Sequence, residues 1–309
     1  MDSIRSIYRM SNRLLILLCL VFTTGFACLA QTESSKTDTL SGGCIPVRSL
    51  EEDKIAFQAK EHLEFALKYD WGLIHTTVGS ASIDLDTVSF NGQKSFYMKA
   101  YGRTSKMFDR VFKVREDFKT WFTVDGLRPL KFTRDTYEGR YRATNCFYYD
   151  WDAPERHIKA DVYTSSSGKR YVELPLTDCT ADLPALFYYA RNMDFDIVEP
   201  GKRYPMTFAI DDDVYNVYFI LFGRETIEVE GIGKVKTIKF AAKLLEGEVF
   251  TGEEDMLIWV SDDENRLPVY FEAPLLVGLA TGRLTAYTGL KYPFTALVEA
   301  AVPKQTKKK

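Results

Sequence analysis

Acidic and amide side chains gather at one point of the sequence, in the stretch WVSDDENRLPVYFEA from Trp259 to Ala273. Such a group could bind calcium, supply a pair of catalytic carboxylates, or form a turn. An EF-hand calcium loop counted from Asp262 would need glycine at its sixth position and glutamate at its twelfth, where Leu267 and Ala273 stand. Runs of aromatic and β-branched residues flank the group on both sides. We therefore interpret Asp262–Asn265 as the tip of a β-hairpin.

The other residues that could do chemistry form no recognisable motif. The three adjacent aspartates at 211–213 suit a turn, because neighbouring strand residues point to opposite faces. The three histidines, at 62, 75 and 157, lack any zinc-ligand spacing. The sequence also lacks GxSxG, SxxK and phosphate-loop motifs. We assign no catalytic residue, no metal ligand and no cofactor. A carboxylate pair distant in sequence, as glycosidases use, remains an alternative.

The first thirty residues read as an export signal. Three arginines precede the apolar run Leu14–Phe22, which is too short to span a bilayer, and small residues follow it. We expect cleavage after Ala30 and a periplasmic location. The alternative is a lipid anchor on Cys28, although Gly25 and Phe26 fit a lipidation site poorly. No later apolar run is long enough for a transmembrane helix.

The charge of the mature chain argues against a nucleic-acid partner. Removing residues 1–30 leaves 40 − 3 = 37 basic and 43 − 1 = 42 acidic residues, a formal charge of −5. The segment 31–50 is rich in Ser, Thr and Gly and reads as a flexible linker, and 301–309 reads as a basic tail. Between them, we expect residues 51–300 to form a single β-rich domain.

Three cysteines remain in the mature chain, and an oxidising compartment would let two of them pair. Cys44 falls in the expected linker, whereas Cys146 and Cys179 fall in the expected domain. If a disulfide exists, we expect Cys146–Cys179. The alternative is that both are buried thiols that pack as small apolar groups.

Strict alternation of apolar and polar residues dominates from about residue 60 onward. In the segment 63–71, Leu63, Phe65, Leu67 and Tyr69 share one face of a strand, and polar residues share the other. Similar runs joined by turn residues recur along the chain, at 78–86, 95–103, 130–137, 141–150, 157–163, 204–210, 214–222, 234–244, 256–260, 269–273 and 283–287. This pattern predicts an all-β fold, a large curved antiparallel sheet or half-barrel.

One helix is expected in TADLPALFYYARNMD, residues 180–194. Asp182 can cap it, Pro184 suits its first turn, and Leu183, Leu186, Phe187 and Ala190 form an apolar stripe. We expect this helix to lie across the concave side of the sheet. The segment 105–115 fits either a short helix or an irregular strand.

Several segments in order resemble the bacterial domain of unknown function 3108 (DUF3108) family. They are KEHLEFALKYDWGLIHTTVGSASIDL, DLPALFYYAR, PGKRYPMTF, FGRETIEVEGIGKVKTIKF and IWVSDDENRLPVYFEA, which together span about residues 58–290. The resemblance implies an exported protein with no assigned activity. It also implies a fold similar to the curved half-barrel of lipoprotein carriers such as LolA. Positions that match the family pattern, and that could face a ligand, are Tyr188, Tyr189, Arg191, Trp259 and Arg266.

Aromatic residues on nominally polar strand faces give the remaining functional hint. Tyr97 lies near Lys99, and Tyr148 shares a segment with Arg142. Such faces could stack sugars or line a groove, or they could be ordinary sheet surface. We expect a non-catalytic envelope protein that binds an apolar, lipidic or glycan ligand, or an envelope protein partner. The alternatives are a hydrolase of envelope polymers and a structural component of an envelope assembly.

Overall fold

The computed structural model describes residues 44–72, 74–242, 256–275 and 278–301. The expected export signal with Cys28, most of the linker and most of the basic tail lie outside these ranges. The first eight strands are β1 (His62–Trp71), β2 (Ile74–Phe90), β3 (Gln93–Thr104), β4 (Val114–Thr123), β5 (Pro129–Glu138), β6 (Tyr141–Asp150), β7 (His157–Thr164) and β8 (Gly168–Pro175). The others are β9 (Thr180–Asp182), β10 (Arg203–Ile210), β11 (Asp213–Val229), β12 (Gly233–Ala242), β13 (Met256–Ser261), β14 (Pro268–Pro274), β15 (Leu279–Thr288) and β16 (Leu297–Ala300).

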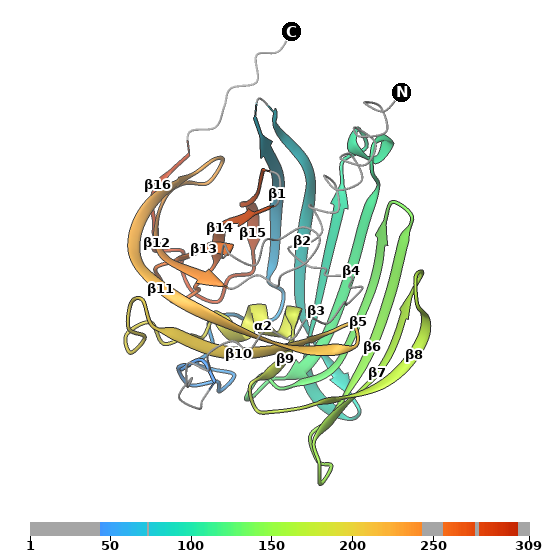
Figure 1. Cartoon of the computed structure of the whole chain (residues 1–309). Helices are drawn as coiled ribbons and strands as arrows, with labels where there is room; N and C mark the ends of the chain where they lie inside the picture. Colours follow the sequence, from blue (N-terminus) through green and yellow to red (C-terminus); the bar gives the residue numbers. More distant parts are fainter. Residues whose placement is uncertain (1–43, 73, 243–255, 276–277, 302–309) are drawn as a thin grey trace, which may run out of the picture.

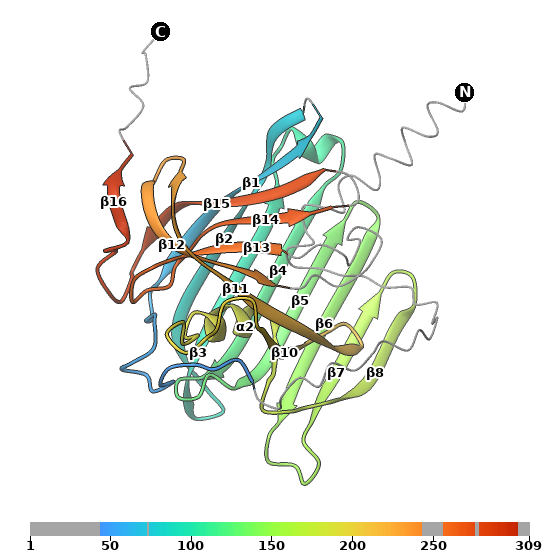
Figure 2. The same ribbon diagram turned by 60° about the vertical axis from the view of Figure 1, so that its left-hand side comes forward.

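All of these strands belong to one sheet of 16 strands, in the order β8-β7-β6-β5-β4-β3-β2-β1-β15-β14-β13-β12-β11-β10-β9, with β16 paired to β12. Two antiparallel meanders are therefore joined where β1 pairs with β15. The short pairing of β9 with β10 is parallel. The sheet curves strongly without closing (Figures 1 and 2). The expectation of a large curved antiparallel sheet is confirmed.

The alternation predicted from the sequence places apolar side chains on the concave face. Leu63, Phe65, Leu67 and Tyr69 of β1 are all buried. In β4 every second residue is buried and its neighbours are half-buried. Because successive strand side chains point to opposite faces, one face of each strand joins the core and the other faces solvent. The sequence does not predict β4, β8, β9 or β16. The inward positions of β4 include Glu116 and Thr120, and β8 has a single buried residue, so neither shows a clear apolar alternation. The strands β9 and β16 have only three and four residues.

The expected helix is α2 (Leu183–Ala190), which lies inside the curve of the sheet (Figures 1 and 2). Its cap is the predicted one, since the Asp182 carboxylate accepts a hydrogen bond from the Ala185 backbone N–H at 2.8 Å. Tyr188 is fully buried against Phe57 and Phe122, with ring centroids 4.5 and 5.9 Å away. The helix therefore fills this part of the concave face.

The hairpin formed by β10 and β11 crosses the concave face in front of the middle strands (Figures 1 and 2). Its turn holds Asp211, whose positive φ of 51° confirms the turn predicted at 211–213. Asp211 is buried and accepts a hydrogen bond from Arg134 of β5 at 2.8 Å. The segment 105–115 contains a short 3-10 turn, η2 (Phe108–Arg110), before β4 begins at Val114.

Candidate ligand-binding site

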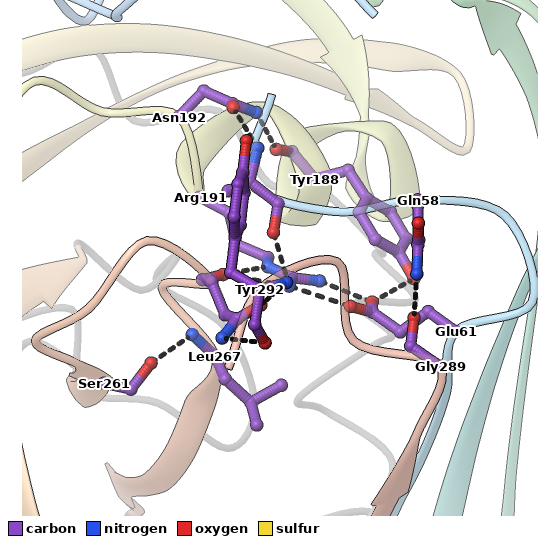
Figure 3. A network of polar contacts seen from close by, with 11 residues as sticks. Gln58, Glu61, Tyr188, Arg191, Asn192, Ser261, Leu267, Gly289 and Tyr292 are labelled. Atoms are coloured by element: carbon purple, nitrogen blue, oxygen red, sulfur yellow. Dashed lines mark hydrogen bonds and ion pairs between the residues drawn. The ribbon is translucent and has the colours of Figure 1, made fainter. Parts of the chain in front are cut away.

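Two of the family-pattern residues, Tyr188 and Arg191, lie together in a buried polar network (Figure 3). Arg191 Nη1 and Nη2 donate to the two carboxylate oxygens of Glu61 at 2.5 and 2.9 Å. The Tyr188 hydroxyl donates to the same carboxylate at 3.1 Å. Arg191 also donates from Nε and Nη2 to the backbone carbonyl of Asn265, at 3.1 and 2.9 Å. One guanidinium thus joins α2, the segment before β1 and the β13–β14 turn.

This network supports the fold, and its side chains are buried and paired with one another. The side chains of Arg191 and Glu61 are 1% and 0% exposed. Burial, with the nearby Glu61 carboxylate, raises the pKa of Tyr188 well above its usual value. A charged pair removed from water is tolerated only where further hydrogen bonds satisfy its atoms, as they do here. We assign Tyr188 and Arg191 to holding α2 in place.

The side chains of the other three family-pattern residues make contacts outside this network. Trp259 donates from Nε1 to Glu225 at 2.7 Å and is nearly buried. The Arg266 guanidinium bonds Asp262 at 3.1 Å and covers the ring of Phe195. Tyr189 lines a cavity of about 30 Å³ beside α2. The five positions therefore do not converge on a single ligand site.

The acidic hairpin tip is a turn whose carboxylates bind the protein itself. Asp263 accepts hydrogen bonds from Ser261 Oγ and the Asn265 N–H, at 2.7 and 3.1 Å, and from the Ala296 N–H. Glu264 pairs with Arg48 at 2.7 Å. The turn predicted from the sequence is confirmed, and these acids fasten it to the segments around residues 48 and 296.

The cysteine pairing expected from the sequence is wrong. Cys179 forms a disulfide with Cys44, and Cys146 is free. Cys146 lies in the middle of β6, opposite Thr133 and Asp161 on the outer face, whereas Cys179 follows the end of β8. The part of the expected linker from Cys44 onward is held on the body, where the Arg48 N–H donates to the Asn192 carbonyl at 2.9 Å.

The outer, convex face carries a row of aromatic and cationic side chains across neighbouring strands. In register order the row is Tyr97 of β3, Trp121 of β4, Lys131 of β5, Tyr148 of β6 and Lys159 of β7. The rings of Tyr97 and Trp121 are in contact, with centroids 4.8 Å apart and planes tilted by 31°. Lys131 Nζ lies 5.3 Å from the Trp121 ring and 5.0 Å from the Tyr148 ring. Cross-strand contacts of this kind fix the side chains in place.

A groove of about 400 Å³ lies at the β6–β7 end of this row, where Tyr148 and Lys159 line it. Its lining comes from the β4–β5 turn and from the start of the β6–β7 connection, together with strand residues. Residues that line it include Arg128, Leu130, Tyr148, Asp150, Trp151 and Lys159. Its volume falls within the range of about 300–1,000 Å³ that is usual for small-ligand sites. Tyr148 is 46% exposed, so its side chain is accessible to a ligand.

The charged residues of the groove are positioned by one another. Lys159 Nζ donates to Asp150 Oδ2 at 3.0 Å. That hydrogen bond lowers the pKa of Asp150 and raises the pKa of Lys159, so both are charged at neutral pH. Trp151 donates from Nε1 to the Pro129 carbonyl at 2.6 Å, and the Arg128 guanidinium lies over its ring. The groove thus offers fixed donors and acceptors beside an aromatic ring.

Two carboxyl groups elsewhere have the raised pKa values that acid catalysis uses, but neither lies at this groove. Burial raises the pKa of Glu116 well above its usual value and the pKa of Asp182 to about 7. Glu116 and Asp182 are 1% and 0% exposed. The Thr136 hydroxyl donates to Glu116, and the Thr120 hydroxyl donates to Asp182. These carboxyls are held inside the fold, away from any substrate in the groove.

Sequence reasoning found Tyr97 and Tyr148 but missed Trp121, Lys131 and the groove. Each groove residue comes from a different turn or strand, so only the register brings them together. The signal that could have found them is the repetition of aromatic and cationic residues at the solvent-facing positions of consecutive strands.

Comparison with known proteins places the chain by family and fold. The family model described as "Protein of unknown function (DUF3108)" matches residues 64–285. No curated protein matches the sequence. A solved β-barrel-like protein of domain of unknown function DUF1849 from Brucella abortus is similar in structure, with a TM-score of 0.51 and 12% identity over 75% of this chain and 98% of that one.

A second solved structure, a "putative lipoprotein" from Parabacteroides distasonis, aligns over 76% of this chain and 99% of its own, with 10% identity and a TM-score of 0.29. At these identities the comparison with the Brucella protein supports the fold alone. Within the described residues, we find no helix with the length and apolar character to cross a membrane.

Proposed function

The chain belongs to the DUF3108 family of proteins of unknown function, and we propose that it is an exported, non-catalytic binding protein of the cell envelope that holds a glycan in its outer groove. The observation that carries this proposal is the exposed ring of Tyr148, fixed from one side by Lys131 and bordered by a groove of about 400 Å³.

The mixture of side chains in the groove suits a sugar better than an apolar lipid. A sugar ring has apolar C–H faces that can stack on an aromatic ring and hydroxyl groups around its edge. Tyr148 offers the ring, while Arg128, Asp150 and Lys159 offer donors and acceptors. A lipid chain would need a groove lined almost wholly by apolar side chains, because burying a charged group without a partner costs free energy.

The disulfide supports the exported location. Disulfides persist in the periplasm and outside the cell, and they are rare in the cytosol. The Cys44–Cys179 bond, together with the export signal expected at residues 1–30, favours the cell envelope.

The electrostatics favour binding over hydrolysis. A general acid needs a proton at working pH and a position within reach of the substrate. In the groove, Asp150 has a lowered pKa and is paired with Lys159. The carboxyls with raised pKa values, Glu116 and Asp182, are buried.

The proposal can be tested by measuring binding to immobilised envelope glycans. Peptidoglycan fragments and lipopolysaccharide oligosaccharides are tested separately, as two arms of the experiment. We expect the purified protein to bind one arm and the Tyr148→Ala variant to lose that binding. The matched control is Tyr163→Ala, since Tyr163 is also exposed on the outer face, in β7, and does not line the groove. Binding to no glycan, or equal loss in both variants, would remove the proposal. Release of bound lipid on solvent extraction would favour the lipid-carrier alternative.

A further inference from the structure

The β3–β4 connection presents apolar side chains to solvent at the end of the sheet opposite the groove. Met107 and Val111 are 65% and 61% exposed. Their neighbours Phe108 and Phe112 instead pack against the core. A side-chain Cβ on Gly139, in the β5–β6 turn, would lie 2.7 Å from a ring carbon of Phe112, so the two hairpin ends are in close contact.

Polar contacts hold this connection in a defined shape. Asp109 accepts hydrogen bonds from Arg115 Nη1 and Nη2, at 2.9 and 2.6 Å, and from the Thr104 hydroxyl at 2.6 Å. The Gly139 N–H donates to the Lys113 carbonyl at 2.9 Å. Met107 and Val111 are thus exposed in a loop of defined shape. The side of the loop that faces the core is occupied by Phe108 and Phe112.

Positive charge is concentrated around these two apolar side chains. The segments 103–115 and 138–142 contain seven Lys and Arg residues and two acidic residues, a net charge of 7 − 2 = +5, whereas the whole chain has −3. Among the acids, Asp109 is paired with Arg115 and Glu138 is buried. In the described part of the chain, no carboxylate lies within ion-pair distance of Arg103, Lys106, Arg110, Lys113, Arg140 or Arg142. We call these six cations, with Met107 and Val111, the basic tip.

We propose that the basic tip docks on the surface of an anionic phospholipid bilayer. Apolar side chains surrounded by Lys and Arg suit the boundary between headgroups and acyl chains, where the apolar groups insert and the cations meet phosphate. A protein partner would have to be strongly acidic and also offer an apolar pocket. A bilayer of anionic lipids supplies both features over any area.

This docking orients the molecule. The basic tip and the groove lie at opposite ends of β5, whose ten residues span about 30 Å. A bilayer bound at the tip therefore leaves the groove facing away from the membrane. The docking surface and the groove share no residue, so this inference does not depend on the glycan proposal.

Flotation with lipid vesicles tests the docking. The protein is expressed as the full chain, purified from the expressing cells, and mixed with vesicles of phosphatidylcholine alone or of phosphatidylcholine and phosphatidylglycerol in equal parts. We expect it to float with the anionic vesicles and to be released by high salt. Lys106→Gln and Arg110→Gln should each lower the partition coefficient about fivefold. Met107→Ser combined with Val111→Ser should lower it about tenfold.

The matched controls are Ile197→Ser and Lys202→Gln, which replace an exposed apolar residue and a cation outside the basic tip. Neither should change flotation. All of the substituted residues are exposed, so the variants should fold, and circular dichroism checks this. Equal binding to neutral and anionic vesicles, binding that the tip variants leave unchanged, or no binding to either vesicle would overturn the proposal. If the protein binds neither kind of vesicle and instead forms dimers on size exclusion that the tip variants abolish, the surface is assigned to a second copy of the chain.

Discussion

Arg191 and Glu61 lie 130 positions apart in the sequence, and their side chains form a two-point ion pair in the protein interior, at 2.5 and 2.9 Å. The pair links the C-terminal end of α2 to the residue before β1. The Asn192 side chain adds a second link, because its Oδ1 accepts a hydrogen bond from the Ala56 N–H at 2.9 Å. The position of α2 inside the sheet thus depends on polar contacts as well as on the burial of Tyr188.

Replacing Arg191 with Met should destabilise the protein strongly. The change leaves the Glu61 carboxylate buried without its cation, which costs about 3–5 kcal/mol in the free energy of unfolding. Urea denaturation measures the effect. The control is Lys202→Met, which removes the exposed ion pair with Glu199 and should leave the unfolding midpoint unchanged. Equal midpoints for the two variants would contradict the role given to Arg191.

Breaking the Cys44–Cys179 disulfide should also lower stability. The bond closes a loop of 135 positions, and removing a native disulfide typically costs about 2–5 kcal/mol. We expect Cys44→Ser to lower the free energy of unfolding by an amount in this range under oxidising conditions. Cys146→Ser should have little effect, and reducing agent should destabilise the parent protein but not Cys44→Ser. Loss of stability in Cys146→Ser, with Cys44→Ser as stable as the parent protein, would instead indicate the Cys146–Cys179 pairing.

The buried Asp182 should make the protein less stable as pH rises from about 4 to about 7. Burial raises the pKa of its carboxyl from 3.8 to about 7, so in this window the unfolded chain releases a proton that the folded protein retains. The stabilisation is complete below pH 3.8 and is lost as pH approaches 7. Asp182→Asn keeps a residue that caps helices well and removes the titration. Urea midpoints measured across this window should fall less steeply with pH in the variant than in the parent protein, and identical slopes would contradict the assignment.

The sequence alone predicts the strands that have one buried face and one solvent-exposed face. Alternation at Leu63, Phe65 and Leu67 follows from burial of one face, and the cap at Asp182 follows from local hydrogen bonding. The stripe expected on α2 was only partly right. Leu186 is buried as expected, but Pro184, Ala185 and Tyr188 are buried as well, since the helix is covered on more than one side.

The candidate site depended on information that one sequence does not hold. The groove combines Arg128, Tyr148 and Lys159, which three different parts of the sheet supply. Their proximity follows from the register of β5, β6 and β7, and turn lengths set that register. The disulfide was missed for a related reason, because the path of the chain from Cys44 to α2 is set by tertiary contacts.

The most direct measurement is the affinity of the groove for a soluble oligosaccharide of the glycan class captured from the envelope. Titration calorimetry would compare the parent protein with Tyr148→Ala and Tyr163→Ala. We predict that Tyr148→Ala weakens binding about tenfold or more, while Tyr163→Ala binds like the parent. Unchanged affinity in Tyr148→Ala would contradict the assignment of the groove as the binding site.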